Sequence, residues 1–135
     1  MLGVRGMTQG IMNRKILIID EHGFSRVCSA ILNSSGYLTE IITHAADLPE
    51  KLNKQSCCLI VISYPFGVSF FESLWQKNIP VIILSDGIDE RMIDLLNNFQ
   101  NSCCMIKPVD YDKFKGMVKQ AVEGSLVFEG GYSIV

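Results

Sequence analysis

The hydrophobic residues of this chain form short continuous runs that alternate with segments of helical periodicity. The runs are rich in isoleucine, leucine and valine, which is typical of strands covered on both faces of a sheet. We predict strands over residues 15–19, 38–42, 59–62, 81–84 and 103–106. Between them and after the last, apolar residues recur at the spacing of a helix with one buried face. The clearest such stripe comprises Phe114, Met117, Val118, Ala121 and Val122.

Capping residues mark several of the predicted helix ends. Gly36 stands where the first helix needs a C-terminal cap. Asp47 and Pro49 open the second helix, because a helix start takes a capping oxygen and tolerates proline in its first turn. A short third helix follows near residues 70–74, and a fourth covers residues 88–99. Asp110 is placed to cap the last helix.

Strands that alternate with helices in this way predict an α/β fold with right-handed crossovers and helices on both faces of a parallel sheet. We expect a flavodoxin-like, doubly wound, five-stranded sheet in the order 2-1-3-4-5. In such a sheet the functional crevice lies at the carboxyl ends of the strands.

The domain is predicted to span residues 14–124, after a flexible leader of residues 1–13. Residues 125–135 form a C-terminal tail with two interpretations. It is either a loosely packed terminus, or a strand or arm that docks on the domain or on another subunit. The second interpretation follows from its apolar side chains, which would be unusual in contact with water.

Composition narrows the function classes. The chain of 135 residues has a net charge of −2 and no basic block, which argues against nucleic-acid binding through charge. No apolar run approaches the length that spans a bilayer, and no signal peptide is recognisable, so we expect a cytoplasmic protein without membrane contact.

The five cysteines include the adjacent pairs Cys57-Cys58 and Cys103-Cys104. Paired cysteine ligands of zinc are usually separated by at least two residues, so these adjacent cysteines are not expected to bind zinc. We expect their thiols to pack in the hydrophobic core.

Polar residues follow or end four of the predicted strands. Asp20 and Glu21 come after the first strand, Ser63 after the third, Ser85 after the fourth, and Lys107 with Pro108 after the fifth. Because parallel strands place their carboxyl ends on one edge of the sheet, these side chains are predicted to meet in one pocket.

This pattern resembles the phosphorylation site of two-component response regulator receiver domains, the CheY-like superfamily, over roughly residues 14–124. The resemblance implies that Asp20 and Glu21 correspond to the acidic pair that binds Mg²⁺. It also implies that Ser85 and Lys107 correspond to the groups that contact the phosphoryl oxygens. Pro108 then corresponds to the proline that follows a cis peptide bond in the family.

The chain departs from the family pattern at three places. Ser63 stands in place of the phosphorylated aspartate, and a serine hydroxyl is a poor nucleophile without an activating base. His22 is the nearest histidine in the sequence and is interpreted as a surface residue. Cys104 stands where the family often has an aromatic residue that moves on activation. The segment between Ser63 and Pro80 is also short for the family.

Loss of the aspartate changes the charge of the site. Asp20, Glu21 and Lys107 together carry −1, whereas a third carboxylate would make the total −2. Mg²⁺ binding is therefore expected to be weak or absent, because a hard dication takes oxygen ligands with negative charge. We predict that Lys107 pairs with Asp20 or Glu21 and holds the site in one state without metal.

These features favour a phosphorylation-independent pseudo-receiver of a phosphorelay or two-component system. It would act by protein–protein binding, with no enzymatic activity and no required cofactor. The expected partner is a histidine kinase or another signalling protein. The surface of the fourth helix, fifth strand and fifth helix, or the tail, is a candidate homodimer interface.

Two alternatives stay open. One is a phosphorylatable receiver with a non-standard acceptor, such as Ser63 itself. The other is a flavodoxin-like module that binds a small ligand at the same edge. The second alternative lacks a glycine-rich phosphate loop, because the turn at residues 21–23 contains a single glycine.

Overall fold

The computed structural model describes residues 15–53, 57–75, 78–99, 101–124 and 132–134. The predicted leader, residues 1–13, lies outside the described residues, as do residues 125–131 and 135 of the tail. The described helices are α2 (His22–Ser34), α3 (Leu48–Asn53), α4 (Phe71–Trp75), α5 (Glu90–Leu96) and α6 (Tyr111–Val122). Short 3₁₀ turns, η1 (Ala45–Asp47) and η2 (Val68–Phe70), precede α3 and α4.

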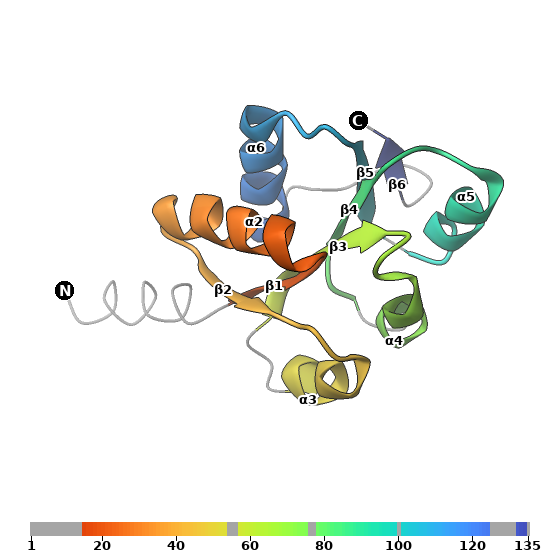
Figure 1. Ribbon diagram of the computed structural model, residues 1–135, viewed down its shortest axis with the longest axis horizontal. Helices are drawn as coiled ribbons and strands as arrows, with labels where there is room; N and C mark the ends of the chain where they lie inside the picture. Colours follow the sequence, from red (N-terminus) through yellow and green to blue (C-terminus); the bar gives the residue numbers. More distant parts are fainter. Residues whose placement is uncertain (1–14, 54–56, 76–77, 100, 125–131, 135) are drawn as a thin grey trace.

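A parallel sheet forms the centre of the molecule (Figure 1). Its strands are β1 (Lys15–Ile19), β2 (Leu38–Ile41), β3 (Cys57–Tyr64), β4 (Val81–Ser85), β5 (Ser102–Ile106) and β6 (Tyr132–Ile134). They lie in the order β2-β1-β3-β4-β5-β6. The first five strands therefore confirm the predicted order 2-1-3-4-5, with every pairing parallel.

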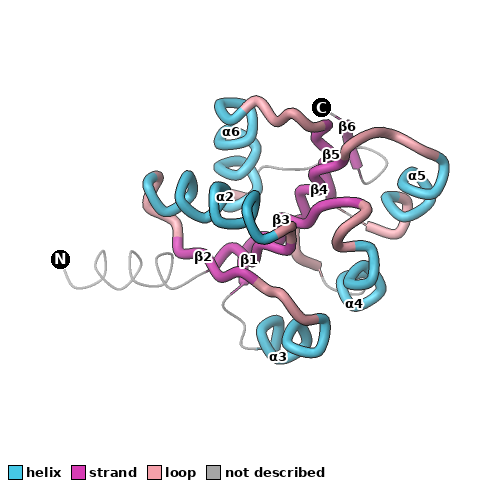
Figure 2. Tube along the Cα trace, in the orientation of Figure 1, coloured by secondary structure: helices cyan, strands magenta, loops and turns pink. Residues whose placement is uncertain are grey.

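The sixth strand comes from the C-terminal tail. It pairs in parallel with β5, so that Ser102 lies opposite Tyr132 and Cys104 opposite Ile134. The tail was predicted to be either a loosely packed terminus or a docked strand or arm. For Tyr132–Ile134, the structure shows a strand docked on the domain. The free edge of β5, part of the surface considered for homodimers, is thus occupied by the chain itself (Figure 2).

Helices cover both faces of the sheet, as the alternating pattern predicts. Figure 1 shows α2 and α6 on one face and α3, α4 and α5 on the other. On the first face, Ile16 and Ile18 pack with Leu32 of α2 and Phe114 of α6. The opposite core contains Phe71 and Phe99, whose rings meet edge-on with their centroids 5.6 Å apart. Burial of such side chains is the main force that stabilises the layers.

Local signals set most helix ends. Gly36 adopts a φ of +95°, and Tyr37 donates its N–H to the carbonyl of Leu32, which closes α2 in the manner expected of a glycine cap. Asp110 accepts hydrogen bonds from the backbone of Asp112 and Lys113 and begins α6. The fourth predicted helix is shorter than residues 88–99, because Asp89 caps it and α5 starts at Glu90.

The cysteines pack as buried thiols, with Cys57 partly exposed. Cys58 is an extra residue in β3, since Lys15 pairs with Cys57 and Ile16 with Leu59. Burial raises the pKa of Cys103 to about 12 and that of Cys104 to about 11, which keeps both thiols protonated at neutral pH. None of the described helices combines the length and the apolar character needed to cross a bilayer.

Candidate functional site

The polar residues predicted to meet do so at the carboxyl ends of β1, β3, β4 and β5. A cavity of about 190 Å³ opens there and is lined by Glu21, Ser63 and Lys107, together with residues of the loops after β3 and β4. Asp20 does not line this cavity, but it forms an ion pair with Lys107, which does. Ser85 lies next to this cavity, in the wall of a neighbouring one.

Asp20 and Lys107 form an ion pair. The Nζ of Lys107 lies 3.6 Å from Oδ1 of Asp20, whose side chain is fully buried. The same oxygen accepts a hydrogen bond of 2.7 Å from the backbone N–H of Glu21. The ammonium group also lies 4.7 Å from the centre of the Phe24 ring, within range of a cation–π contact. Between Asp20 and Glu21, the lysine therefore selects the buried acid.

The two serines differ in their hydrogen bonding. Ser63 is buried, and its Oγ has no hydrogen-bond partner among the described residues. The hydroxyl of Ser85 donates to the carbonyl of Gly87 and accepts from the Gly87 N–H at 3.3 Å. Ser85 is thus engaged with its own loop, and Ser63 contributes a neutral hydroxyl group to the wall of the cavity.

The donor set does not fit a Mg²⁺ site of the family type. Such a site needs several anionic oxygens at one point. Here one oxygen of Asp20 faces an ammonium group, Glu21 is exposed at the rim, and Ser63 offers no charge. Among the described residues, no three acidic, histidine or cysteine side chains are grouped closely enough to hold a metal ion.

Two X-Pro peptide bonds at this edge are cis. The Lys107-Pro108 bond is the one that the family resemblance implies, and the Tyr64-Pro65 bond is a second one that was not predicted. Together they shape the loops that follow β5 and β3. His22 is exposed at the start of α2, in keeping with its interpretation as a surface residue.

Tyr64 is a site residue that sequence reasoning missed. It follows Ser63 directly, and its hydroxyl lies 3.3 and 3.4 Å from the two carboxylate oxygens of Asp89. Asp89 in turn accepts a 2.7 Å hydrogen bond from the N–H of Met92. Burial and the charge of Asp89 raise the pKa of Tyr64, so it remains a neutral donor. The chain of contacts ties the end of β3 to the start of α5.

Cys104 is the residue that the family resemblance aligns with a mobile aromatic side chain. It is fully buried on the α5 side of the sheet, and its Sγ lies 3.8 Å from the sulfur of Met92. β5 therefore contacts α5 through packed sulfur atoms, and the site residue Tyr64 contacts Asp89, the residue that caps this helix.

The loop after β3 is held tightly by Gly67. Its N–H donates a 2.8 Å hydrogen bond to the carbonyl of Ser63. A Cβ atom at this position would lie 2.5 Å from Cγ1 of Ile62 and 2.8 Å from that carbonyl. Only glycine fits this approach without a shift of its neighbours, and this allows the short connection between Ser63 and α4.

Comparison with known proteins identifies the fold. No protein-family model matches the chain, and no curated protein matches it in sequence. Among solved structures, a CheY-like response regulator receiver domain protein from Methanospirillum hungatei JF-1 superposes with a TM-score of 0.71 at 18% identity, over 83% of this chain and 95% of that one. A two-component response regulator from Clostridium difficile gives 0.70 at 17% identity, over 82% and 96% of the two chains. An orphan response regulator of H. pylori gives 0.67 at 15% identity, over 82% and 98%. The chain therefore has the fold of response regulator receiver domains.

Proposed function

We propose that this chain is a pseudo-receiver, which acts in cytoplasmic two-component or phosphorelay signalling by binding a protein partner. In this proposal its conformation does not depend on phosphorylation, it has no enzymatic activity, and it requires no cofactor. A histidine kinase or another signalling protein is the proposed partner. The receiver fold supports the signalling role, and the partner-binding role is the one that a receiver retains without its phosphoacceptor.

The observation that carries the proposal is the Lys107–Asp20 ion pair beside a central serine. A phosphoryl group would need a carboxylate nucleophile, a metal ion and a free lysine. In this proposal Ser63 takes the nucleophile position, and Lys107 already has the buried Asp20 as its partner at 3.6 Å. The ammonium group is thus neutralised within the protein, which favours one fixed state.

A phosphoryl analogue provides the test. The amide spectrum of ¹⁵N-labelled protein is recorded with and without Mg²⁺ and BeF₃⁻, and again with acetyl phosphate. We expect no shifts at residues 20–21, 63–64, 85 or 107. The Ser63→Asp variant restores the missing carboxylate and serves as the positive control, while Ser63→Ala is the matched negative control. Shifts in the unmodified protein that Ser63→Ala abolishes would show that the site is functional and refute the proposal.

A further inference from the structure

The site cavity is one end of a longer groove. A second cavity of about 340 Å³ shares Tyr64, Pro65 and Asp86 with it. A third, of about 450 Å³, shares Ile88 and Asp89 with the second. Each cavity thus adjoins the next along these shared residues, from Ser63 to the first turns of α5, and the three together are called the groove.

This groove is strongly acidic. Its walls carry five carboxylates against one lysine: Glu21, Asp86, Asp89, Glu90 and Asp94 against Lys107. Lys107 is already paired with Asp20. Glu90 and Asp94 are four residues apart on α5, an arrangement in which like charges repel and destabilise a helix. A cationic group between them would relieve this repulsion.

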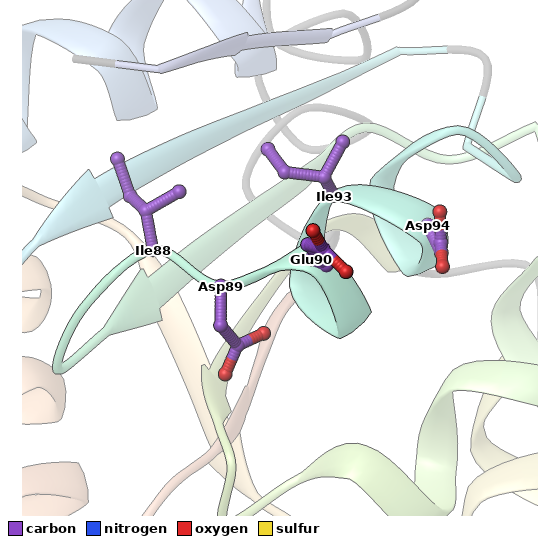
Figure 3. A pocket seen from close by; sticks show the side chains of 5 residues that line it. All are labelled: Ile88, Asp89, Glu90, Ile93 and Asp94. Atoms are coloured by element: carbon purple, nitrogen blue, oxygen red, sulfur yellow. The ribbon is translucent and has the colours of Figure 1, made fainter.

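Apolar side chains lie along the same groove. Phe66 is 47% exposed and Ile88 is 54% exposed, while Ile93 is partly buried. Figure 3 shows Ile88 and Ile93 projecting on one side of the segment and Asp89 on the other. The contact from Tyr64 to Asp89, and the hydrogen bond from Met92 to Asp89, fix the segment before any partner arrives. A preformed surface of this kind lowers the entropic cost of binding.

We propose that this groove binds a segment of a partner protein that carries lysine or arginine interleaved with apolar residues. Apolar side chains of the segment contact Ile88 and Ile93, and its cations lie against Glu90 and Asp94. The inference rests on the proposed binding function and specifies the chemistry of the partner. Charge complementarity selects this occupant, since phosphate-rich ligands would be repelled by the same carboxylates.

The test uses a short synthetic peptide that alternates lysine with leucine, titrated into the full-length ¹⁵N-labelled protein. We expect saturable shifts centred on residues 88–94 that weaken as salt is added. The Glu90→Gln/Asp94→Asn variant is expected to raise Kd about five- to tenfold. Asp112→Asn/Glu123→Gln, which removes one exposed carboxylate of α6 and one at its C-terminal cap, is the matched control and leaves Kd unchanged. Ile88→Ser tests the apolar contact independently and is expected to raise Kd.

Three results would overturn the proposal. The first is an absence of shifts at residues 88–94, and the second is equal binding by a peptide with glutamate in place of each lysine. The third is a concentration-dependent shift of residues 88–94 without peptide, which would assign the groove to a second copy of the chain. The BeF₃⁻ spectra and the peptide titration are separate experiments. Failure of the phosphorylation-independent function appears only in the first, and failure of the peptide-binding proposal appears only in the second.

Discussion

Two groups hold the ammonium group of Lys107: the buried carboxylate of Asp20 and the ring of Phe24. The polar residues after the strands predicted that Lys107 and the acidic pair, Asp20 and Glu21, would meet at one edge of the sheet. This pattern did not decide between Asp20 and Glu21, because that choice depends on burial. Asp20 is directed into the protein behind β1, whereas Glu21 is exposed at the start of α2. A charge attracts a buried partner more strongly than a partner in water, so the partly exposed lysine pairs with Asp20.

Replacement of Lys107 with methionine is expected to lower the free energy of unfolding by about 2 kcal/mol, because a buried carboxylate loses its counter-charge. The Asp20→Asn/Lys107→Met double variant is expected to regain most of this loss, since no charge then remains buried. Urea denaturation of the unmodified protein, both single variants and the double variant gives the coupling energy directly. Additive effects of the two substitutions would show that the ion pair does not hold the site.

Most elements were predictable because their signals are local. Runs of aliphatic residues gave the strands, and Gly36, Asp89 and Asp110 act at helix ends as their residue types suggest. The contacts between elements were not predictable in the same way. The hydrogen bond from Tyr64 to Asp89 joins residues 25 positions apart, and no pattern within either segment reveals it.

The loop between β3 and α4 depends on a single glycine. Gly67→Ala is expected to destabilise the protein by about 1–3 kcal/mol, because its Cβ would overlap Ile62 and the Ser63 carbonyl. Gly87→Ala is the matched control in the loop between β4 and α5, since a Cβ there meets no atom within 4 Å. Thermal and urea denaturation of both variants provide the measurement. Equal stability of the two variants would mean that the loop after β3 adjusts freely.

The overall architecture follows from the alternation of strands and helices, with one addition. The order of β1 to β5 is dictated by right-handed crossovers and by burial of both sheet faces. The sequence of the tail allowed either a loose end or a docked strand. A strand of three residues has too little local signal to be recognised, and it forms only because β5 offers an unpaired edge as a template. Its position therefore depends on the folded domain.

Deletion of residues 132–135 tests what β6 contributes to the whole molecule. Without this strand, backbone groups of Ser102–Cys104 on the outer edge of β5 lose their partners and become accessible to water. We expect faster amide hydrogen exchange in β5 and unchanged exchange in β2, which forms the opposite edge of the sheet. The free energy of unfolding is expected to fall by about 1–2 kcal/mol, since each net hydrogen bond contributes modestly. Lys107 directly follows β5, so the same deletion also tests whether β6 helps to hold the site residues in place. Unchanged exchange in β5 would show that β6 does not protect this edge in solution, and the edge would then be free for a partner.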